Sequence, residues 1–286
     1  MKIEVANHSG FCFGVKRAIK IVEQTLKKEK NIYCMGPIIH NPQVVKNLTA
    51  RGLKIVKDIS IIKEGILVIP AHGLEPELIK KAYKKGLKII DATCPLVRKA
   101  QKYAEQLKKD KYHIVIIGDK NHAETKGIVG FCGTNFQVVE NKAEIDIKRL
   151  EMEKKIGIVS QTTQGIWNLR EISLAVLPYS NELRIYNTIC ETTIRKQNAA
   201  KKLAKRSDIM IVIGGYNSAN TKRLVEVSKE TGVKTYHIET AQDINFIWLK
   251  DKEKIGISAG ASTSPESIKE VVTIIKTRIK TLRSKD

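Results

Sequence analysis

The sequence predicts an α/β protein built from three similar units, each a parallel sheet covered by helices. Apolar runs of strand length alternate with amphipathic helical stretches along the whole chain, which is the pattern of parallel sheets with helices on their faces. In addition, Cys12, Cys94 and Cys190 recur with a period of about ninety residues, and each occupies the same place in the alternation. We therefore expect three copies of one α/β unit. The expected units span residues 1–94, 95–189 and 190–286.

Each cysteine lies between a short strand and an amphipathic helix. The strands before the three cysteines are expected at 3–6, 87–92 and 183–188. Apolar stripes at helical spacing follow the first two cysteines, and a weaker stripe that includes Ile194 and Ala200 follows the third. The continuous Val/Ile runs at 113–118 and 209–213 are typical of strands that are buried on both faces. A last amphipathic helix is expected to end the third unit.

The composition indicates a globular protein of the cytoplasm. The hydrophobic content of 42% is sufficient for a packed core. The first residues turn polar before an apolar signal segment could form, and no apolar run approaches the ~18 residues that a membrane helix needs. The five cysteines are odd in number and widely spaced, which argues against a framework of disulfides. Because neither a signal segment nor a membrane helix is predicted, we expect no membrane association.

The charge balance favours an anionic partner. Lys and Arg number 51 against 30 Asp and Glu, which gives a net charge of +21. Aromatic residues make up only 5% of the chain and no cationic run is interleaved with them, so a nucleic-acid partner is disfavoured. The positive field favours an anionic substrate or an acidic protein partner, beside a general use of Lys as a surface residue.

The three repeated cysteines predict a metal or iron–sulfur site. Each precedes a helix, whose dipole favours the thiolate form. If the three copies close on one another, three thiolates meet, and a four-iron cluster held by three thiolates keeps one iron without a protein ligand. Zinc is the competing metal, although no C-x-x-C pair is present. Cys34 and Cys132 have no counterparts in the other copies, so we interpret them as core or incidental residues.

Polar residues follow the apolar runs in every copy. In parallel α/β sheets, ligands bind beyond the carboxyl ends of the strands, where helix N-termini present free N–H groups. Three histidines are interpreted as lying at equivalent strand ends and suggest an anion or metal pocket: His40, His72 and His122. The hydroxyl and amide side chains of these loops are Thr162, Thr163, Ser218, Asn220 and Ser262. Glu124 is the only carboxylate in the converging loops, so it is the candidate proton donor.

Eight short strings carry a resemblance to a known family over the whole chain. They are G-F-C-F-G-V-K-R-A (10–18), I-H-N (39–41), A-H-G (71–73), D-A-T-C-P-L-V (91–97), N-H-A-E (121–124), S-Q-T-T (160–163), N-S-A-N-T (217–221) and A-G-A-S (259–262). In this order they resemble the 4-hydroxy-3-methylbut-2-enyl diphosphate reductases of the non-mevalonate isoprenoid route. The resemblance implies three parallel-sheet α/β units in a pseudo-threefold trefoil around a central [4Fe–4S] cluster, one per chain. It also implies reductive dehydration of an allylic alcohol diphosphate to isopentenyl and dimethylallyl diphosphates.

The same resemblance implies roles for individual residues. Cys12, Cys94 and Cys190 would ligate the cluster, and Glu124, helped by Thr162, would deliver the proton that lets water leave. The diphosphate would be held by His40, His72, Ser218, Asn220 and Ser262, with His122 and Thr163 lining the same pocket. The family usually reads N-S-S-N where this chain reads N-S-A-N, so Ala219 offers the substrate only its backbone N–H.

Two electrons would reach the cluster from an outside carrier. The positive charge predicts that this carrier is acidic, of the ferredoxin or flavodoxin type. From the residues alone, two other functions remain open. One is a zinc-dependent hydrolase of a phosphorylated metabolite that uses the same Cys, His and Glu loops. The other is a basic RNA-associated protein with a structural cluster.

Overall fold

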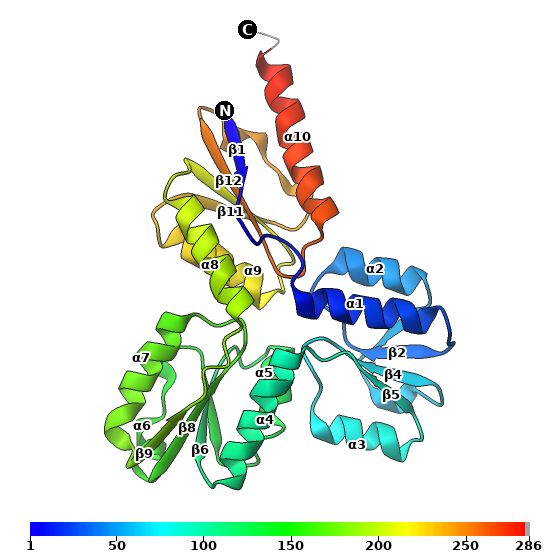
Figure 1. The fold of residues 1–286 in the computed structure, drawn as a ribbon, viewed down its shortest axis with the longest axis vertical. Helices are drawn as coiled ribbons and strands as arrows, with labels where there is room; N and C mark the ends of the chain where they lie inside the picture. The colour runs from blue at the N-terminus through cyan, green and yellow to red at the C-terminus, as the bar shows by residue number, and fades with distance from the viewer. Residues whose placement is uncertain (284–286) are drawn as a thin grey trace. The chain divides into compact units, whose positions relative to one another are not determined.

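The computed structural model describes residues 1–283, which form twelve strands and ten α-helices (Figure 1). The strands are β1 (Lys2–Val5), β2 (Ile32–Met35), β3 (Leu53–Val56), β4 (Ile66–Ile69), β5 (Lys88–Asp91), β6 (His113–Ile117), β7 (Phe136–Val139), β8 (Lys155–Ser160), β9 (Glu182–Ile185), β10 (Ile209–Ile213), β11 (Lys234–Ile238) and β12 (Lys254–Ala259). The helices are α1 (Phe13–Leu26), α2 (Pro42–Ala50), α3 (Pro76–Lys84), α4 (Pro95–Lys109), α5 (Ala123–Val129), α6 (Ile147–Glu151), α7 (Ile166–Val176), α8 (Glu191–Ala204), α9 (Ala219–Lys229) and α10 (Pro265–Arg283).

The strands form three four-stranded sheets with one common strand order, and the registers are parallel throughout. The orders are β3-β2-β4-β5, β7-β6-β8-β9 and β11-β10-β12-β1. We number the strands of each sheet in chain order from β2, β6 or β10, with β1 counted as the fourth strand of its sheet. In each sheet the first strand then lies between the second and the third, and a fourth strand forms the edge beside the third. The expected α/β class and its threefold repetition are therefore confirmed at the level of the sheets.

The described residues divide into two compact units, which we call the terminal unit and the central unit. The terminal unit contains residues 1–13, 40–42 and the chain from 191 onward, and the central unit contains 14–39 and 43–190. The sheet of β10, β11, β12 and β1 belongs to the terminal unit, and the other two sheets belong to the central unit.

This division differs from the three expected ranges at β1. That strand was expected in the unit 1–94, but it pairs with β12, with Ile3 opposite Ile255 and Val5 opposite Ile257. The reason is that β5 already fills the fourth place in the first sheet, whereas the last sheet has only three strands from its own third of the chain. The first cysteine loop, which follows β1, therefore starts from the edge of the last sheet.

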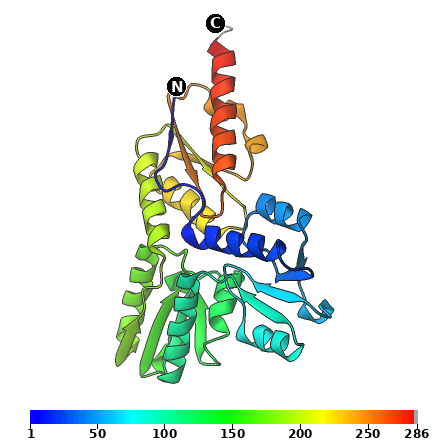
Figure 2. The same cartoon turned by 45° about the vertical axis from the view of Figure 1, so that its right-hand side comes forward.

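The core of the terminal unit shows why its central strand is apolar at every position. Ile209, Ile211 and Ile213 of β10 pack in one cluster with residues of α10, whereas Val212 packs with α8 and α9. Successive strand residues point to opposite faces, so a sheet with helices on both faces needs apolar residues at every position. Figure 1 shows α10 on one side of this sheet and α8 and α9 on the other, and Figure 2 gives the turned view.

The central unit repeats the arrangement around β6. All five residues of β6 are buried, and Ile114 and Ile116 pack with the helices α4 and α5. Burial of one such side chain contributes about 1.5–3 kcal/mol. The expected double burial of the runs at 113–118 and 209–213 is thus confirmed for β6 and β10. Over residues 1–283, every helix is too short or too polar to cross a membrane.

Candidate active site

The three repeated cysteines occupy equivalent backbone positions. Each lies directly before a helix, at the start of α1, α4 or α8. Each backbone N–H donates to a carbonyl in the loop that follows the third strand of its sheet, after β12, β4 or β8. These bonds run from Cys12 to Ala261 at 3.1 Å, from Cys94 to Ala71 at 2.9 Å and from Cys190 to Thr162 at 2.9 Å. The equivalence predicted from the repeat therefore extends to the backbone hydrogen bonds.

The environments of the five cysteines separate them into two classes. Cys34 and Cys132 are buried, and burial raises the pKa of both thiols, that of Cys132 to about 12. Cys12, Cys94 and Cys190 remain partly exposed, and each lies beside a helix N-terminus. Cys12 belongs to the terminal unit, and Cys94 and Cys190 belong to the central unit. This donor set fits iron–sulfur ligation, and the interpretation of the other two cysteines as core residues is confirmed.

Glu124 is a buried acid held by one residue of the neighbouring loop. It lies in the first turn of α5 with only 3% of its surface exposed. Its Oε1 accepts a hydrogen bond from the backbone N–H of Thr162 at 2.6 Å, and its Oε2 accepts one from the Thr162 hydroxyl at 3.0 Å. Burial raises the pKa of Glu124 to about 7, although both bonds from Thr162 act to lower it. The contact between Glu124 and Thr162 agrees with the pairing that the resemblance implied.

Thr162 also connects this acid to a cysteine. Its carbonyl accepts the hydrogen bond from the N–H of Cys190, while its N–H and hydroxyl serve Glu124. The preceding residue, Gln161, is fully buried, and its Oε1 accepts a bond from the N–H of Asp119 at 3.2 Å. The loop is therefore fixed on both sides of the residue that holds the acid.

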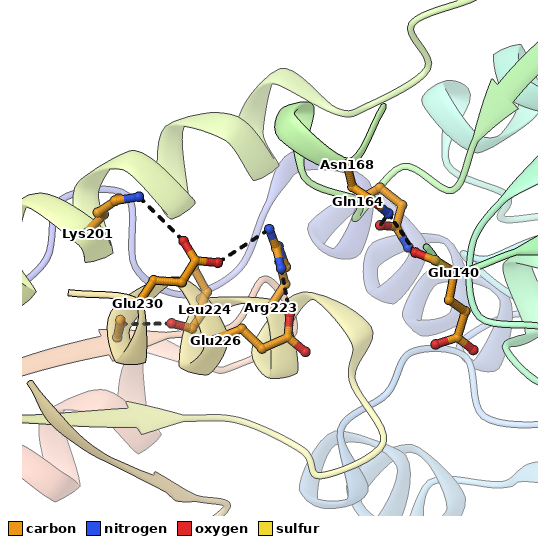
Figure 3. A network of polar contacts seen from close by, with 9 residues as sticks. Glu140, Gln164, Asn168, Lys201, Arg223, Leu224, Glu226 and Glu230 are labelled. Atoms are coloured by element: carbon orange, nitrogen blue, oxygen red, sulfur yellow. Dashed lines mark hydrogen bonds and ion pairs between the residues drawn. The ribbon is translucent and has the colours of Figure 1, made fainter. Parts of the chain in front are cut away.

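The far end of the same loop is held by α7. Asn168 Nδ2 donates to Gln164 Oε1 at 3.2 Å and to the carbonyl of Glu140 at 2.7 Å (Figure 3). Figure 3 also draws Arg223 of α9 with Glu226 and Glu230, which is a separate set of ion pairs in the terminal unit. Only the Asn168 contacts bear on the loop that carries Thr162 and Thr163.

His72, Thr163 and Ser262 form one equivalent set. Each follows the carbonyl that accepts a bond from a cysteine N–H, after β4, β8 and β12 respectively. The interpretation that His72 shares a strand end with His40 and His122 is therefore wrong, because His40 and His122 follow β2 and β6, the first strands of their sheets. The sequence pattern located the loops but did not distinguish first strands from third strands.

His40 and Ser262 lie against each other in the terminal unit. The Ser262 hydroxyl donates to the His40 carbonyl at 3.0 Å, and Asn41 Nδ2 donates to the Ser262 carbonyl at 2.6 Å. Gly215 allows this close approach, because a Cβ there would lie 2.8 Å from the His40 carbonyl oxygen. Burial lowers the pKa of the His40 side chain, which disfavours its charged form.

The start of α9 presents a buried amide. Ser218 caps this helix through its hydroxyl, Ala219 is the first helical residue and Asn220 is the second. His122 caps α5 in the same way, by accepting the N–H of Glu124 at its Nδ1. Asn220 is 4% exposed, and in the described chain neither its Oδ1 nor its Nδ2 has a hydrogen-bond partner. An unpaired buried amide costs about 1–3 kcal/mol, which a bound polar ligand would recover.

Sequence reasoning missed Gln161 and the structural role of Asn41. Gln161 stands inside the S-Q-T-T string, next to Thr162, and that position was the available signal. Asn41 was noticed as part of the I-H-N string, but its contact with Ser262 joins segments more than two hundred residues apart. No local pattern encodes such a contact.

The described residues of each compact unit contain no preassembled set of metal ligands. Zinc in proteins takes three or four ligands from Cys, His, Asp and Glu. Within each compact unit, no three of these side chains among residues 1–283 gather as ligands of one metal ion. The partly exposed cysteines are instead one per sheet copy, as the repeat predicts.

Comparison with known proteins identifies the family. The LytB protein family matches residues 3–276. A 4-hydroxy-3-methylbut-2-enyl diphosphate reductase from Geobacter metallireducens is 45% identical over 96% of this chain and 97% of its own length. One from Alkaliphilus oremlandii is 44% identical over 95% of this chain and 98% of its own. These names describe reductases and do not support a hydrolase.

Two solved structures agree with the sequence relatives. A structure of (E)-4-hydroxy-3-methyl-but-2-enyl diphosphate reductase, described as the terminal enzyme of the non-mevalonate pathway, is 42% identical, with a TM-score of 0.69 over 96% of this chain and 99% of that one. The E-1-hydroxy-2-methyl-but-2-enyl-4-diphosphate reductase of Plasmodium falciparum is 32% identical, with a TM-score of 0.87 over 95% of this chain and 87% of that one. By sequence, length and fold, the chain belongs to the LytB protein family.

Proposed function

We propose that this protein is an oxidoreductase that converts (E)-4-hydroxy-3-methylbut-2-enyl diphosphate to isopentenyl and dimethylallyl diphosphates. In this reaction the C–O bond to the hydroxyl group breaks, two electrons and two protons enter, one C–H bond forms and water leaves. Besides family membership, the single observation that carries the proposal is the buried Glu124 held by Thr162. A hydroxyl is a poor leaving group, so the reaction needs an acid of this kind.

Glu124 supplies the proton to the departing oxygen. A carboxyl with a pKa of about 7 is about half protonated at neutral pH, whereas an ordinary Glu with a pKa near 4.5 is almost fully ionised there. General acids work best when their pKa is close to the working pH. Thr162 orients the carboxyl with two hydrogen bonds and stabilises the carboxylate that remains after proton transfer.

Cys12, Cys94 and Cys190 hold a [4Fe–4S] cluster, one per chain. The cluster, when bound, supplies the two electrons of the reaction. Three observations support the assignment: the cysteines are partly exposed, each precedes a helix, and their N–H groups make the same backbone hydrogen bond. Thiolates at helix N-termini are the ligands that iron–sulfur clusters use.

The diphosphate is held by side chains and N–H groups of the loops that follow the strands. We assign to it the side chains of His40, His72, Ser218, Asn220 and Ser262, the N–H of Ala219, and the neighbouring His122 and Thr163. The unpartnered amide of Asn220 supports this assignment, because its Nδ2 is a buried donor without an acceptor in the described residues. The N-termini of α5 and α9 add first-turn N–H groups, which favour anions.

An acidic electron carrier of the ferredoxin or flavodoxin type delivers the electrons in the cytoplasm. The net charge of +21 supports steering of such a carrier toward this protein. Turnover with a ferredoxin is expected to fall as salt is raised from low ionic strength, because salt screens the attraction. Turnover with a small neutral reductant serves as the control, and equal salt responses would remove the steering argument.

The assignment of the cluster ligands is tested by anaerobic purification and counting of iron and sulfide. Cys12→Ser, Cys94→Ser and Cys190→Ser are each expected to lose most of the cluster. Cys34→Ser and Cys132→Ser are the matched controls and are expected to retain it, because these two thiols are buried in apolar surroundings. Wild-type protein with a full cluster that fails to convert the substrate under strong reductant would contradict the proposed reaction.

A further inference from the structure

A buried lysine holds the loop that leads to Cys12. Lys196 of α8 has only 3% of its surface exposed. Its Nζ donates to the carbonyl of His8 and to the carbonyl of Gly10, the latter at 2.6 Å. His8 and Gly10 both have positive φ angles, 64° and 88°, so the loop turns sharply at the two residues whose carbonyls bind Lys196. The lysine therefore fixes the backbone within two residues of a proposed cluster ligand.

The other side of this loop is fixed by the third strand of its sheet. The N–H of Gly10 donates to the carbonyl of Ala259 at 3.5 Å, and the N–H of Cys12 donates to that of Ala261 at 3.1 Å. The amides of the loop are thus bound to the β12 end, while its carbonyls are bound to Lys196. The two sets of bonds therefore constrain both the amides and the carbonyls of the loop backbone.

An arginine holds the loop before Cys94 in a related way. Arg17 lies on α1, the helix that follows Cys12, and is half-buried. Its Nη1 donates to the carbonyl of Thr93 at 3.0 Å, and Thr93 directly precedes Cys94. In both cases a cation on the helix after one cysteine binds the carbonyls before another cysteine.

The loop before Cys190 is held by an aromatic stack and a threonine hydroxyl. Tyr103 on α4, the helix after Cys94, stacks on Tyr186 with ring centroids 4.0 Å apart. The Thr188 hydroxyl donates to the Ser160 carbonyl at 2.6 Å and accepts the Ser160 N–H at 2.8 Å. Hydrogen bonds from a lysine or arginine side chain to the loop carbonyls are thus described at the Cys12 and Cys94 loops.

We propose that Lys196 and Arg17 are positioning residues for the iron–sulfur cluster, which fix the Cys12 and Cys94 loops and raise the reduction potential of the bound cluster. The inference rests on the proposed function, since it assumes that these cysteines bind the cluster. A cluster with three thiolates carries negative charge that grows on reduction, and a nearby cation stabilises the reduced form. Burial keeps the charge of Lys196 from being fully screened by salt.

The loop-holding part is tested by hydrogen exchange on the metal-free full-length protein. Lys196→Met is expected to speed exchange of the Gly10 and Cys12 amides by roughly tenfold to a hundredfold, since a hydrogen bond to a charged group is worth more than a neutral one. Lys196→Arg keeps the charge and donors and is expected to restore slow exchange. Lys202→Met, an exposed lysine on the same helix, is the matched control. Unchanged exchange in Lys196→Met would overturn the proposal.

The charge part is tested by the midpoint potential of the loaded cluster. Lys196→Met and Arg17→Met are each expected to lower the potential, and Lys202→Met and the exposed Lys20→Met, with the same change in net charge, are expected to lower it less. Arg17 lies in the central unit and contacts a different cysteine loop. Arg17→Met therefore tests the inference even if Lys196→Met does not fold. Equal potentials in the buried and exposed variants would refute the charge part. A wild-type protein that binds no cluster would refute the proposed function instead, and the exchange experiment on metal-free protein would still report on the loops.

Discussion

The starts of α5 and α9 occupy the same place in two copies of the repeat but are completed differently. Glu124 is the second residue of α5 and Asn220 is the second residue of α9, and both are buried. Glu124 accepts two hydrogen bonds from Thr162, whereas neither polar atom of Asn220 has a partner within residues 1–283. The position that Thr162 holds after β8 is held by Ala261 after β12, and alanine has no hydroxyl to offer.

The next residue of each helix shows the same contrast. Thr125 donates its hydroxyl to Gln161 at 3.4 Å, while the buried hydroxyl of Thr221 has no partner in the described chain. The residue equivalent to Gln161 is Gly260, since the N–H groups of both donate at 2.8 Å to the last residue of a first strand. A Cβ at Gly260 would overlap the Thr221 hydroxyl, so a side chain there needs a shift. One copy, which we call the closed copy, is thus arranged around an acid, and the other, the open copy, has buried polar groups without a partner in the described chain.

The largest expected effect comes from Glu124→Gln. The variant keeps the shape of the closed copy but cannot donate a proton, so turnover is expected to fall by at least ~10²–10⁴-fold, the usual share of general acid catalysis. Iron and sulfide content and affinity for the substrate are expected to stay close to those of the parent. The measurement is anaerobic turnover beside a substrate titration on one preparation. Near-normal turnover with the cluster intact would mean that another group or an ordered water supplies the proton.

Asn220→Ala tests the open copy. The loss of a hydrogen bond to the diphosphate, worth about 1.5–3 kcal/mol for a charged partner, is expected to weaken substrate affinity by roughly 10- to 150-fold. The free energy of unfolding without substrate is expected to stay equal or rise, because an unpaired buried amide is removed and no hydrogen bond of the free protein is lost. Isothermal titration and denaturant unfolding give the two quantities, with the exposed Asn217→Ala as control. A large loss of stability with unchanged affinity would show that Asn220 serves the fold and not the ligand.

The pH dependence of turnover tests the contributions of Glu124 and Thr162 to proton donation. With a pKa of about 7, Glu124 loses its proton as pH rises, so turnover limited by proton donation is expected to fall above about pH 7. The Thr162 hydroxyl stabilises the carboxylate and lowers this pKa, so Thr162→Val is expected to move the falling limb to higher pH. Thr49→Val, at an exposed position, is the control for loss of a hydroxyl. If the pH at which turnover falls is the same in Thr162→Val as in the parent, the pH dependence of turnover does not arise from Glu124 and Thr162.

The smallest expected effect compares two threonines. Thr221→Val removes a buried hydroxyl without a partner and is expected to leave the free energy of unfolding equal or raise it by up to about 1 kcal/mol. Thr125→Val removes a long hydrogen bond to Gln161 and is expected to lower that free energy by about 0.5–1 kcal/mol. Urea unfolding of both variants measures the difference, and the opposite order would contradict the contrast between an open and a closed copy.

Much of the fold was predictable because it repeats within the sequence. Three cysteines at one period and continuous Val/Ile runs such as β6 and β10 identified the sheets and the loops beyond them. The pairing of β1 with β12 could not be read in this way, because it depends on which sheet lacks a fourth strand and not on any property of residues 2–5. The roles of Thr162 and Ala219 came from the family resemblance alone.

The residues that the sequence did not reveal are buried polar groups with distant partners. Lys196 stands in the gap of the weak apolar stripe between Ile194 and Ala200, and this gap was the available signal. A lysine in such a gap is usually exposed, so its burial was not expected from composition. Its acceptors are carbonyls of His8 and Gly10 at the other end of the chain, and carbonyls carry no side-chain signature.

The pairing of β1 with β12 also affects the order in which the sheets can form during synthesis. β1 emerges about 250 residues before β12, whereas the strands of the central unit pair with close neighbours in the chain. The central unit is therefore able to complete both of its sheets during synthesis while β1 has nothing to pair with. Cys12, the first of the three cysteines to be translated, is thus the last to acquire its backbone hydrogen bond, from the loop after β12. The Cys12 loop therefore reaches its native backbone contacts only after translation of nearly the whole chain.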